Sequence, residues 1–199
     1  MKLYLVRHAQ RDFGLKFDQL NDVGIEQAKR LGYYFKNKKI DFIYCSINKR
    51  AKETLKYILP FLKKPFKITY TSRLRQHNVP EEVGKEAFKI LKLKEKIETK
   101  EELEKRTRDF WKYLKKKHGK HTILIVSHKQ VIKALICQIL NLSLDESVYI
   151  DKLPSASIST FEFDKKLKTF LIGDLTHLLI SHTLVTFPSA HPNSILIKT

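Results

Sequence analysis

The sequence predicts an α/β fold: a three-layer sandwich with a mostly parallel central sheet flanked by helices, plus a helical excursion. This prediction rests on three observations. Short apolar runs of strand length alternate with segments whose apolar residues recur at helical spacing. No stretch has the composition of a linker, and there is no internal repeat. The chain has 199 residues and is 42% hydrophobic, which suits one sizeable core, so we expect a single domain over 1–199.

The first half of the chain alternates strands with helices. We expect strands at 2–7, 42–45 and 67–70, because these runs are apolar and short. Helices are expected from about 24 to 37 and from about 48 to 60, where apolar residues recur every three or four positions. Strand–helix alternation of this kind favours parallel strands.

The middle of the chain interrupts this rhythm with a helical excursion over about 72–118. Two consecutive helical patterns occupy it, and the first covers 81–97. The second pattern begins with a capping-box signature, in which Thr99 precedes Glu102 by three positions, and Gly119 ends it.

Strands return in the second half. A strand at 123–126 precedes a strongly apolar helix at 131–139. The runs 157–163 and 168–173 are expected to pair as neighbouring strands. The tail, from about 179 to 199, is expected to be irregular or to form a late edge strand.

The formal net charge of +18 indicates attraction to anions, from phosphorylated metabolites to nucleic acid or acidic lipid. Lysine supplies most of this charge and is scattered along the chain. We find no nucleic-acid-binding module and no basic face with interleaved aromatic residues. Most of the lysines are therefore interpreted as solvated surface, with nucleic-acid binding as an alternative.

Cysteine usage and hydropathy bear on location. Cys45 and Cys137 lie in apolar surroundings and form no metal-binding motif, so we expect buried free thiols in a reducing compartment. No apolar run approaches the roughly 18 residues of a membrane span. The N-terminus does not have the pattern of a signal peptide, because Arg7 and His8 interrupt its apolar run. We therefore expect a cytoplasmic protein.

Two of the predicted strands end in polar pairs, Arg7-His8 and Ser127-His128. Sites in open α/β sheets form at the carboxyl ends of the strands, so these pairs are expected to converge. Arg50 lies near the start of the helix that follows the second strand. Guanidinium groups and helix N-termini suit a tetrahedral phosphate, and a neutral imidazole is a competent nucleophile toward phosphorus. A satisfied core histidine would explain either His8 or His128 alone, but not the same placement twice.

Several motifs together resemble the histidine phosphatase superfamily, also called the phosphoglycerate mutase-like family, in its phosphatase branch. The motifs, in chain order, are LVRHA, LNDVGIEQAKRL, CSINKRAKETL, ILIVSHKQVIKAL, PSASISTFEFD and IGDLTHL. The resemblance reaches to about residue 178 and implies one phosphoglycerate mutase-like domain. Each motif alone is weakly specific, but their order and spacing together are specific.

The resemblance implies roles for individual residues. His8 would attack the phosphoryl group and carry it as phosphohistidine, while Arg7, Arg50 and His128 would bind the phosphoryl oxygens. No metal and no other cofactor is implied. The remaining histidines considered are expected outside the site: His118, His121, His182 and His191 at the surface, and His177 in a structural place.

The sequence departs from the family pattern in three places. Ala9 follows the first histidine, where glycine is usual, and is a mild change. Lys129 stands where glycine is common, and it either adds positive charge to the rim of the substrate-binding site or points to solvent.

Gln76 falls where members with a general acid carry glutamate, and glutamine cannot transfer a proton at neutral pH. Glu81, Glu82 or His77 could replace that acid, although the two glutamates also suit the first turn of a helix. Otherwise the substrate has a good leaving group, or the activity is weak.

The leading hypothesis is a metal-independent phosphatase that hydrolyses a small phosphorylated compound. The alternatives are a phosphoglycerate mutase-type phosphotransferase and a catalytically weakened phosphate-binding homologue. The mutases carry a longer insert after the third strand and keep the glutamate, which favours the phosphatase. We expect no specific nucleic-acid partner and no membrane partner. The oligomeric state is left open, with a homodimer as one option, and substrate specificity is expected to lie in 72–118.

Overall fold

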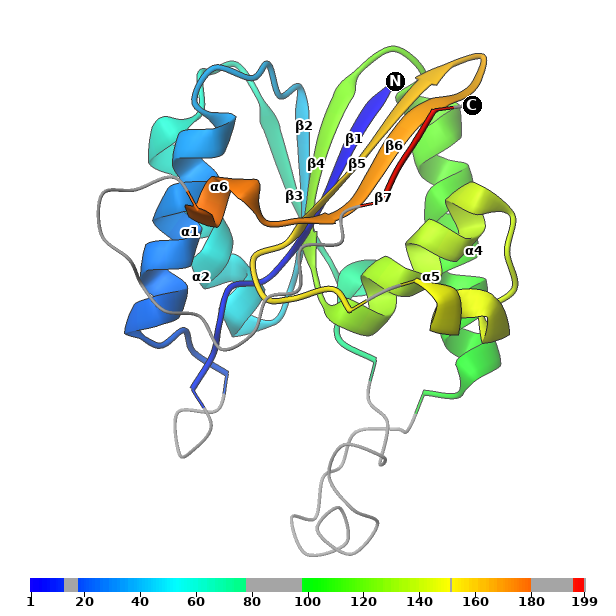
Figure 1. Cartoon of the computed structure of the whole chain (residues 1–199), viewed down its shortest axis with the longest axis horizontal. Coiled ribbons are helices and arrows are strands. Elements are labelled where there is room, and N and C mark those ends of the chain that lie inside the picture. The colour runs from blue at the N-terminus through cyan, green and yellow to red at the C-terminus, as the bar shows by residue number, and fades with distance from the viewer. Residues whose placement is uncertain (13–17, 78–97, 151, 180–194, 199) are drawn as a thin grey trace, which may run out of the picture.

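A seven-stranded mixed sheet lies between two layers of helices (Figure 1). The computed structural model describes residues 1–12, 18–77, 98–150, 152–179 and 195–198, the last of these through the backbone alone. The strands are β1 (Lys2–Arg7), β2 (Phe42–Ser46), β3 (Lys67–Thr71), β4 (Thr122–Ser127), β5 (Ile158–Asp164), β6 (Lys166–Asp174) and β7 (Ile195–Lys198). The helices are α1 (Asp22–Phe35), α2 (Lys49–Ile58), α4 (Lys100–Lys117), α5 (Lys129–Leu140) and α6 (Thr176–Leu179), with short 3₁₀ turns η1 (Leu59–Phe61), η2 (Ser72–Leu74) and η4 (Asp145–Tyr149).

The strand order is β3-β2-β4-β1-β5-β6-β7. The pairs β2–β3, β2–β4 and β1–β4 are parallel, and the pairs from β1–β5 onward are antiparallel. Helices α1, α2 and α6 cover one face of the sheet, and α4 and α5 cover the other (Figure 1). The predicted fold class, a three-layer α/β sandwich with a mostly parallel sheet, is confirmed.

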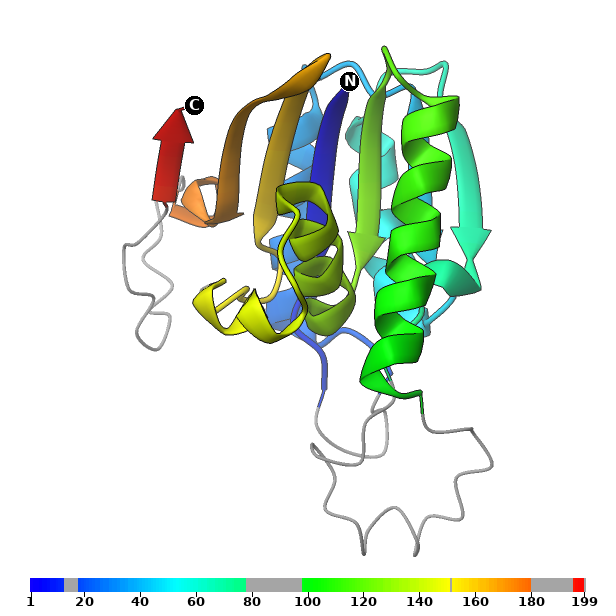
Figure 2. The same cartoon turned by 90° about the vertical axis from the view of Figure 1, so that its right-hand side faces the viewer.

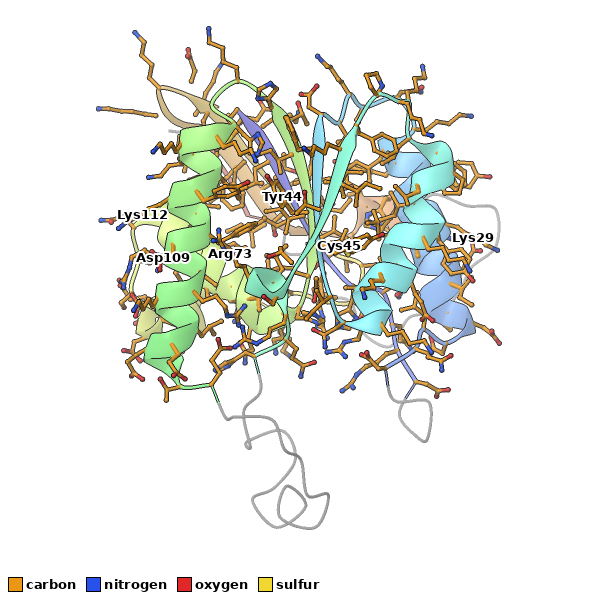
Figure 3. The ribbon with its side chains drawn as sticks, turned by 180° about the vertical axis from the view of Figure 1, so that it is seen from behind. Lys29, Tyr44, Cys45, Arg73, Asp109 and Lys112 are labelled. Atoms are coloured by element: carbon orange, nitrogen blue, oxygen red, sulfur yellow. The ribbon has the colours of Figure 1, made fainter. Side chains whose placement is uncertain are left out.

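The central strands are apolar throughout because both of their faces are covered. Along β1, Leu3 and Leu5 belong to the core beneath α4 and α5, while the alternating Tyr4 and Val6 belong to the core beneath α1 and α2. The neighbours Tyr44 and Cys45 on β2 divide in the same way, and Figure 3 shows them on opposite sides of the sheet. A continuous apolar run is the expected pattern for such a strand.

Parallel pairing aligns the carboxyl ends of the three strands at the centre of the sheet. β4 lies between β1 and β2, and its register pairs Arg7 with Ser127 and Cys45 with Val126. In Figure 2 these ends point downward, toward the same edge of the molecule. The polar residues that follow the strands therefore meet there, as the topology predicts.

The helices begin and end within a few residues of the expected positions. Helix α1 starts at Asp22 because the side chain of Asn21 accepts a hydrogen bond from the Gly24 amide at 2.9 Å. The capping box of Thr99 and Glu102 is present at the start of α4. Among the described residues, no helix has both the length and the apolar character needed to cross a membrane.

The end of the chain contains the expected strand pair and a late edge strand. β5 and β6 form an antiparallel pair whose turn residue, Lys165, has a φ of 58°. The tail, expected to be irregular or to form a late edge strand, forms β7 at Ile195–Lys198, which pairs with β6. Residues 180–194 lie outside the described part, as does the helix predicted at 81–97.

One surface prediction is wrong. His118, expected at the surface, is only 1% exposed, because the turn from α4 into β4 folds its ring against β2. Tyr44 Oη lies 2.7 Å from His118 Nε2, and the ring of Phe42 is 4.1 Å away, centre to centre. His121 is exposed and His177 is buried, as expected. Cys45 and Cys137 are buried free thiols, also as expected.

Candidate active site

Three buried side chains converge at the carboxyl edge of the sheet. His8 follows β1, His128 follows β4, and Arg50 lies in the first turn of α2. Their exposed fractions are 5%, 3% and 3%, respectively. The imidazole ring centres of His8 and His128 are 5.2 Å apart. The structure therefore brings together residues that are 120 positions apart in the sequence.

The hydrogen bonds of His8 establish which of its ring nitrogens carries the proton. Nδ1 lies 2.8 Å from the carbonyl oxygen of Ala9, which can only accept, so Nδ1 is the protonated nitrogen. Arg50 donates from Nε to Nε2 of His8 at 3.1 Å, so Nε2 holds a lone pair. Burial, Arg50 and Arg7 all lower the pKa of His8 well below its ordinary value. His8 is thus a neutral imidazole whose lone pair lies on Nε2, where it accepts the Arg50 Nε–H.

Arg7 lies across the same edge, half-buried. Its NH1 donates to the carbonyl oxygen of Leu153 at 2.5 Å, which fixes the guanidinium between β1 and the segment before β5. The charge of Arg7 lowers the pKa of both His8 and His128, after the larger effect of burial. The predicted cluster of two arginines and two histidines is therefore present at this edge.

Asp18 is a site residue that the sequence analysis missed. Its carboxylate forms an ion pair with NH1 of Arg50 and accepts a hydrogen bond from the Lys49 amide at 2.9 Å. Asp18 thereby holds Arg50 from the side opposite His8 and caps the first turn of α2. An aspartate near a predicted helix start is too common to be singled out from sequence; only its contact with Arg50 identifies it.

The backbone after His8 is also fixed. The Ala9 amide donates to Oγ1 of Thr54 at 3.0 Å, and Thr54 Oγ1 donates to the Arg50 carbonyl at 2.8 Å. Gly24 brings the first turn of α1 against the same segment, because a Cβ at this position would overlap the Gln10 carbonyl oxygen. His8 is therefore held by its own strand, by α1 and by α2.

His128 is anchored to β2 and to the segment after β3. Ser46 Oγ lies 2.8 Å from His128 Nε2 and donates to Oδ1 of Asn48 at 3.0 Å. The same Oδ1 accepts a hydrogen bond from the backbone N–H of Gln76 at 3.0 Å. Burial, then the neighbouring His8, Arg50, Arg7 and Arg106, lower the pKa of His128. The imidazole is therefore neutral.

Comparison with known proteins now decides the family. A model of the histidine phosphatase superfamily (branch 1) matches residues 3–172. The chain belongs to the histidine phosphatase superfamily. That range includes every one of the site residues described above, and the resemblance seen in the sequence motifs is confirmed.

Individual members of the superfamily match most of the chain. A protein of Hydrogenobacter thermophilus with the provisional name phosphoserine phosphatase 2 is 28% identical, over 88% of this chain and 97% of its own. The structure of Bacillus stearothermophilus YhfR is similar at 23% identity, with a TM-score of 0.71 and 89% and 98% of the two chains covered. Phosphoserine phosphatase from Entamoeba histolytica, solved with 3-phosphoglyceric acid, has 23% identity, the same coverage and a TM-score of 0.65. The family and these relatives are consistent with a phosphoric monoester hydrolase.

Gln76, the predicted departure from the histidine phosphatase pattern, lies beside the site. The backbone N–H of Gln76 donates a hydrogen bond to the side chain of Asn48. Asn48 in turn accepts from Ser46, whose hydroxyl oxygen contacts His128. Glu81 and Glu82, the alternative acids, lie outside the described residues. Lys129 is the first residue of α5 and is half-buried, next to His128.

The segment that carries Gln76 is clamped by a buried ion pair. Glu98 is 6% exposed, and its carboxylate oxygens accept two hydrogen bonds from Arg106, both at 2.6 Å. Arg75 NH2 adds a bond to Glu98 at 3.0 Å. Arg106 also donates to the Arg73 carbonyl at 2.6 Å, and His77 Nε2 lies 2.9 Å from the Glu98 carbonyl. The start of α4 therefore holds residues 73–77 in place.

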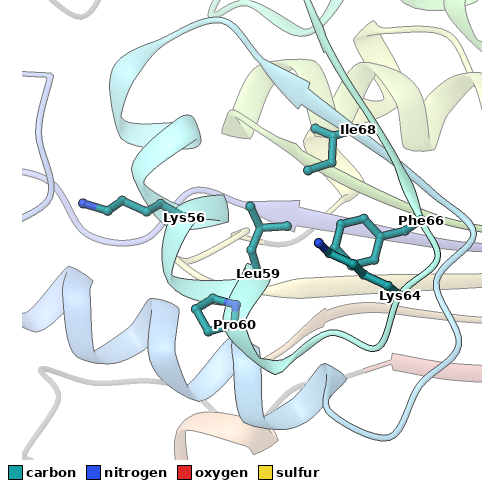
Figure 4. A pocket seen from close by; sticks show the side chains of 6 residues that line it. All are labelled: Lys56, Leu59, Pro60, Lys64, Phe66 and Ile68. Atoms are coloured by element: carbon teal, nitrogen blue, oxygen red, sulfur yellow. The ribbon is translucent and has the colours of Figure 1, made fainter.

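A separate surface pocket lies at the other end of α2 from Arg50 (Figure 4). Its volume is about 610 Å³, and its lining consists of Lys56, Leu59, Pro60, Lys64, Phe66 and Ile68. None of the cluster described above contributes to it. Within the part of the chain that the structure describes, no group of three or more His, Cys, Asp or Glu side chains could hold a metal ion.

Proposed function

We propose that this histidine phosphatase is a metal-independent enzyme that hydrolyses a small phosphorylated compound through a phosphohistidine on His8. The observation that carries this proposal is the proton arrangement of His8. Its Nδ1–H donates to the Ala9 carbonyl, while Nε2 keeps its lone pair and receives the Arg50 Nε–H. A nucleophilic histidine must be neutral, and the lowered pKa keeps it so.

In the first step, the Arg50 Nε–H moves from Nε2 of His8 to a phosphoryl oxygen, and the freed Nε2 lone pair forms a bond to phosphorus while the bond from phosphorus to the leaving oxygen breaks. The leaving oxygen departs with the bonding electron pair and takes up a proton from solvent. Positive charge develops on the imidazole and is stabilised by the Nδ1–H bond to Ala9. Arg7, Arg50 and His128 are proposed to bind the phosphoryl oxygens, whose negative charge they stabilise in the transition state.

In the second step, water attacks phosphorus, and the N–P bond breaks with its electron pair returning to Nε2. The water loses a proton to solvent in the process, and inorganic phosphate leaves. The glutamate that performs both proton transfers in other members is Gln76 here, which hydrogen-bonds but does not transfer protons. The preferred substrates are therefore expected to have leaving groups that need little protonation, such as acyl phosphates and phosphoamidates.

The substrate class proposed is a small anionic phosphate compound. The positive charges of Arg7 and Arg50 suit the phosphoryl group, and the net charge of +18 favours anionic ligands in general. Two of the relatives are named as phosphoserine phosphatases, so phosphoserine belongs in the test panel, where its alkoxide leaving group should make it a slower substrate than an acyl phosphate. Specificity is proposed to come from the 72–118 segment, which contributes Gln76 to the edge of the site.

The test is hydrolysis of p-nitrophenyl phosphate in the presence of EDTA, because its leaving group needs no acid. Turnover by the wild type, with none by His8→Ala, is the expected result. Phosphate binding without turnover by the wild type would instead identify a phosphate-binding homologue. A panel of phosphoserine, 3-phosphoglycerate and phosphoamidate then defines the substrate, and transfer between phosphoglycerate positions would indicate a mutase.

A further inference from the structure

A chain of hydrogen bonds with only one consistent direction ends on His128. These hydrogen bonds link the backbone N–H of Gln76 to Asn48 Oδ1, Asn48 Oδ1 to Ser46 Oγ, and Ser46 Oγ to Nε2 of His128, with separations of 3.0, 3.0 and 2.8 Å. We propose that Asn48 and Ser46 are positioning residues that hold the proton of His128 on Nε2. Nδ1 is then the nitrogen that meets the phosphoryl group, and it has no proton to donate until a second one binds.

The backbone N–H of Gln76 determines the direction of these hydrogen bonds. A backbone N–H can only donate, so the atom of Asn48 that faces it is the oxygen and not the amide nitrogen. The reversed Asn48 amide would place two donors 3.0 Å apart. Because Oδ1 can only accept, the hydroxyl hydrogen of Ser46 points to Asn48. Ser46 Oγ then offers His128 a lone pair, and Nε2 of His128 must be the donor.

The use of Asn48 is itself informative. Asn48 is the N-cap residue of α2, where an asparagine side chain ordinarily accepts a hydrogen bond from the first turn of the helix. Here it makes no such bond, and Asp18 accepts the Lys49 amide instead. The Asn48 side chain is thus diverted from helix capping to the link between Gln76 and Ser46. The backbone N–H of Asn48 donates to Ser46 Oγ at 3.2 Å, which completes the hydroxyl's partners.

The two histidines consequently have opposite proton arrangements. His8 has its proton on Nδ1 and its lone pair on Nε2, whereas His128 has its proton on Nε2. Nδ1 of His128 is buried and has no hydrogen-bond partner among the described residues. A lone pair there repels an anionic oxygen that carries no hydrogen. Binding a dianion at this nitrogen therefore requires a second proton on His128.

The surroundings determine when that proton binds. The groups that act on His128 are His8, Arg50, Arg7 and Arg106, and together with burial they disfavour a charged imidazole in the empty site. A bound dianion offsets these positive charges and favours the protonated form. Proton uptake by His128 is therefore coupled to anion binding. This inference deepens the proposed function and rests on it for the identity of the anion as a phosphoryl group.

The proton arrangement can be tested without any ligand or turnover. Long-range ¹⁵N–¹H NMR correlations of the imidazole groups distinguish the two neutral tautomers, and the spectrum of His128→Gln assigns the signals. The wild type is expected to show the Nε2–H form of His128. Ser46→Ala should release it to the Nδ1–H form, and Ser46→Thr, which keeps the hydroxyl, should restore Nε2–H. An Nδ1–H wild type would overturn the proposal.

Asn48 provides a second, more remote test of direction. Asn48→Leu removes the acceptor, so the Ser46 hydroxyl can rotate and donate to His128 Nε2, which then shifts to Nδ1–H. Asn48→Asp offers an oxygen to both Gln76 and Ser46, so the Nε2–H form is expected to remain. If Asn48→Leu and Asn48→Asp give the same tautomer, Asn48 does not set the direction.

Proton uptake is measured by calorimetry with inorganic sulfate, a tetrahedral dianion that carries no proton at neutral pH. Titration is done at about pH 8, above the ordinary imidazole pKa of about 6.5, in buffers of different ionisation enthalpy. The wild type should take up about one proton per sulfate bound, whereas Ser46→Ala should take up much less because its Nδ1–H donates directly. Ser72→Ala, at an exposed serine, is the matched control.

Equal proton uptake by the wild type and Ser46→Ala would overturn the coupling. The outcomes are separable from those of the proposed function, because the NMR experiment uses the empty protein. A wild type with Nε2–H on His128 but no p-nitrophenyl phosphate turnover would support the proposed proton arrangement and refute the proposed phosphatase activity. Turnover by a wild type with Nδ1–H on His128 would refute only the proposed proton arrangement.

Discussion

Arg50 donates from its Nε to Nε2 of His8 across 3.1 Å, in an enclosed site where both side chains are at least 95% buried. A guanidinium that donates to an imidazole nitrogen identifies that nitrogen as a lone-pair site. Asp18 holds the other end of the same guanidinium. Nucleophile and phosphate ligand are thus positioned together before any substrate binds, a form of preorganisation that lowers the cost of reaching the transition state.

His8→Ala should abolish hydrolysis of p-nitrophenyl phosphate while leaving the fold intact, because it removes the only proposed nucleophile. The check is a steady-state assay with circular dichroism of the variant. Trapping with labelled substrate should yield acid-labile, base-stable phosphate at His8 in the wild type. Appreciable turnover by the alanine variant would show that His8 is not the nucleophile.

Arg50→Ala should lower kcat/KM by roughly 10²–10³-fold, since it removes a preorganised donor from the phosphoryl site. Asp18→Asn should have a smaller effect of the same kind, because the Lys49 amide keeps an acceptor while Arg50 loses its counter-charge. Vanadate inhibition constants should weaken in the same order. A kinetically silent Arg50→Ala would show that the guanidinium does not bind the phosphoryl group.

Gln76→Glu tests the missing acid. In the wild type, log kcat/KM should fall steeply as the leaving-group pKa rises, with alkyl phosphates far below aryl phosphates. Gln76→Glu should flatten that slope, because a side chain of nearly the same shape regains a transferable proton. Glu81→Gln and Glu82→Gln are the controls; if one of them steepens the slope while Gln76→Glu changes nothing, the acid lies elsewhere on the chain.

Glu98→Gln should destabilise the protein strongly, because it leaves the Arg106 charge buried without its partner. Breaking a buried ion pair costs about 3–5 kcal/mol, and the side chains are 5% and 10% exposed. Urea unfolding measures the change. Arg75→Ala, at a side chain that is 39% exposed, should cost far less, about 1 kcal/mol at most. Similar losses from both variants would contradict the clamp.

Buried His177 is expected to make the stability of the protein depend on pH. Burial lowers its pKa to about 4, from an ordinary value of 6.5. Between these two values the unfolded chain binds the proton and the folded chain does not, so stability falls as the pH falls through this window. His177→Gln should reduce that fall, as followed by Tm between about pH 7 and pH 4. Identical Tm profiles for the wild type and His177→Gln would contradict this assignment.

Much of the fold could be predicted from the sequence, because the signals involved are local. The strand β1 is an apolar run buried on both faces, and the cap of α4 is a three-residue pattern. The convergence of His8 and His128 follows from parallel pairing of β1 and β4, so the residue types and the strand ends sufficed to predict it. The place of Arg50, near the start of the helix that follows β2, added it to the same cluster.

The remaining site residues depend on contacts between distant segments. Asp18 and Asn48 are ordinary polar residues until folding places one against Arg50 and the other against Gln76. The burial of His118 likewise depends on how the turn after α4 packs on β2. Hydrogen-bond direction is a property of a whole network, since each donor or acceptor limits its neighbour. The sequence by itself determined the strands and the cluster at their ends, while the tertiary structure alone decided where the protons lie.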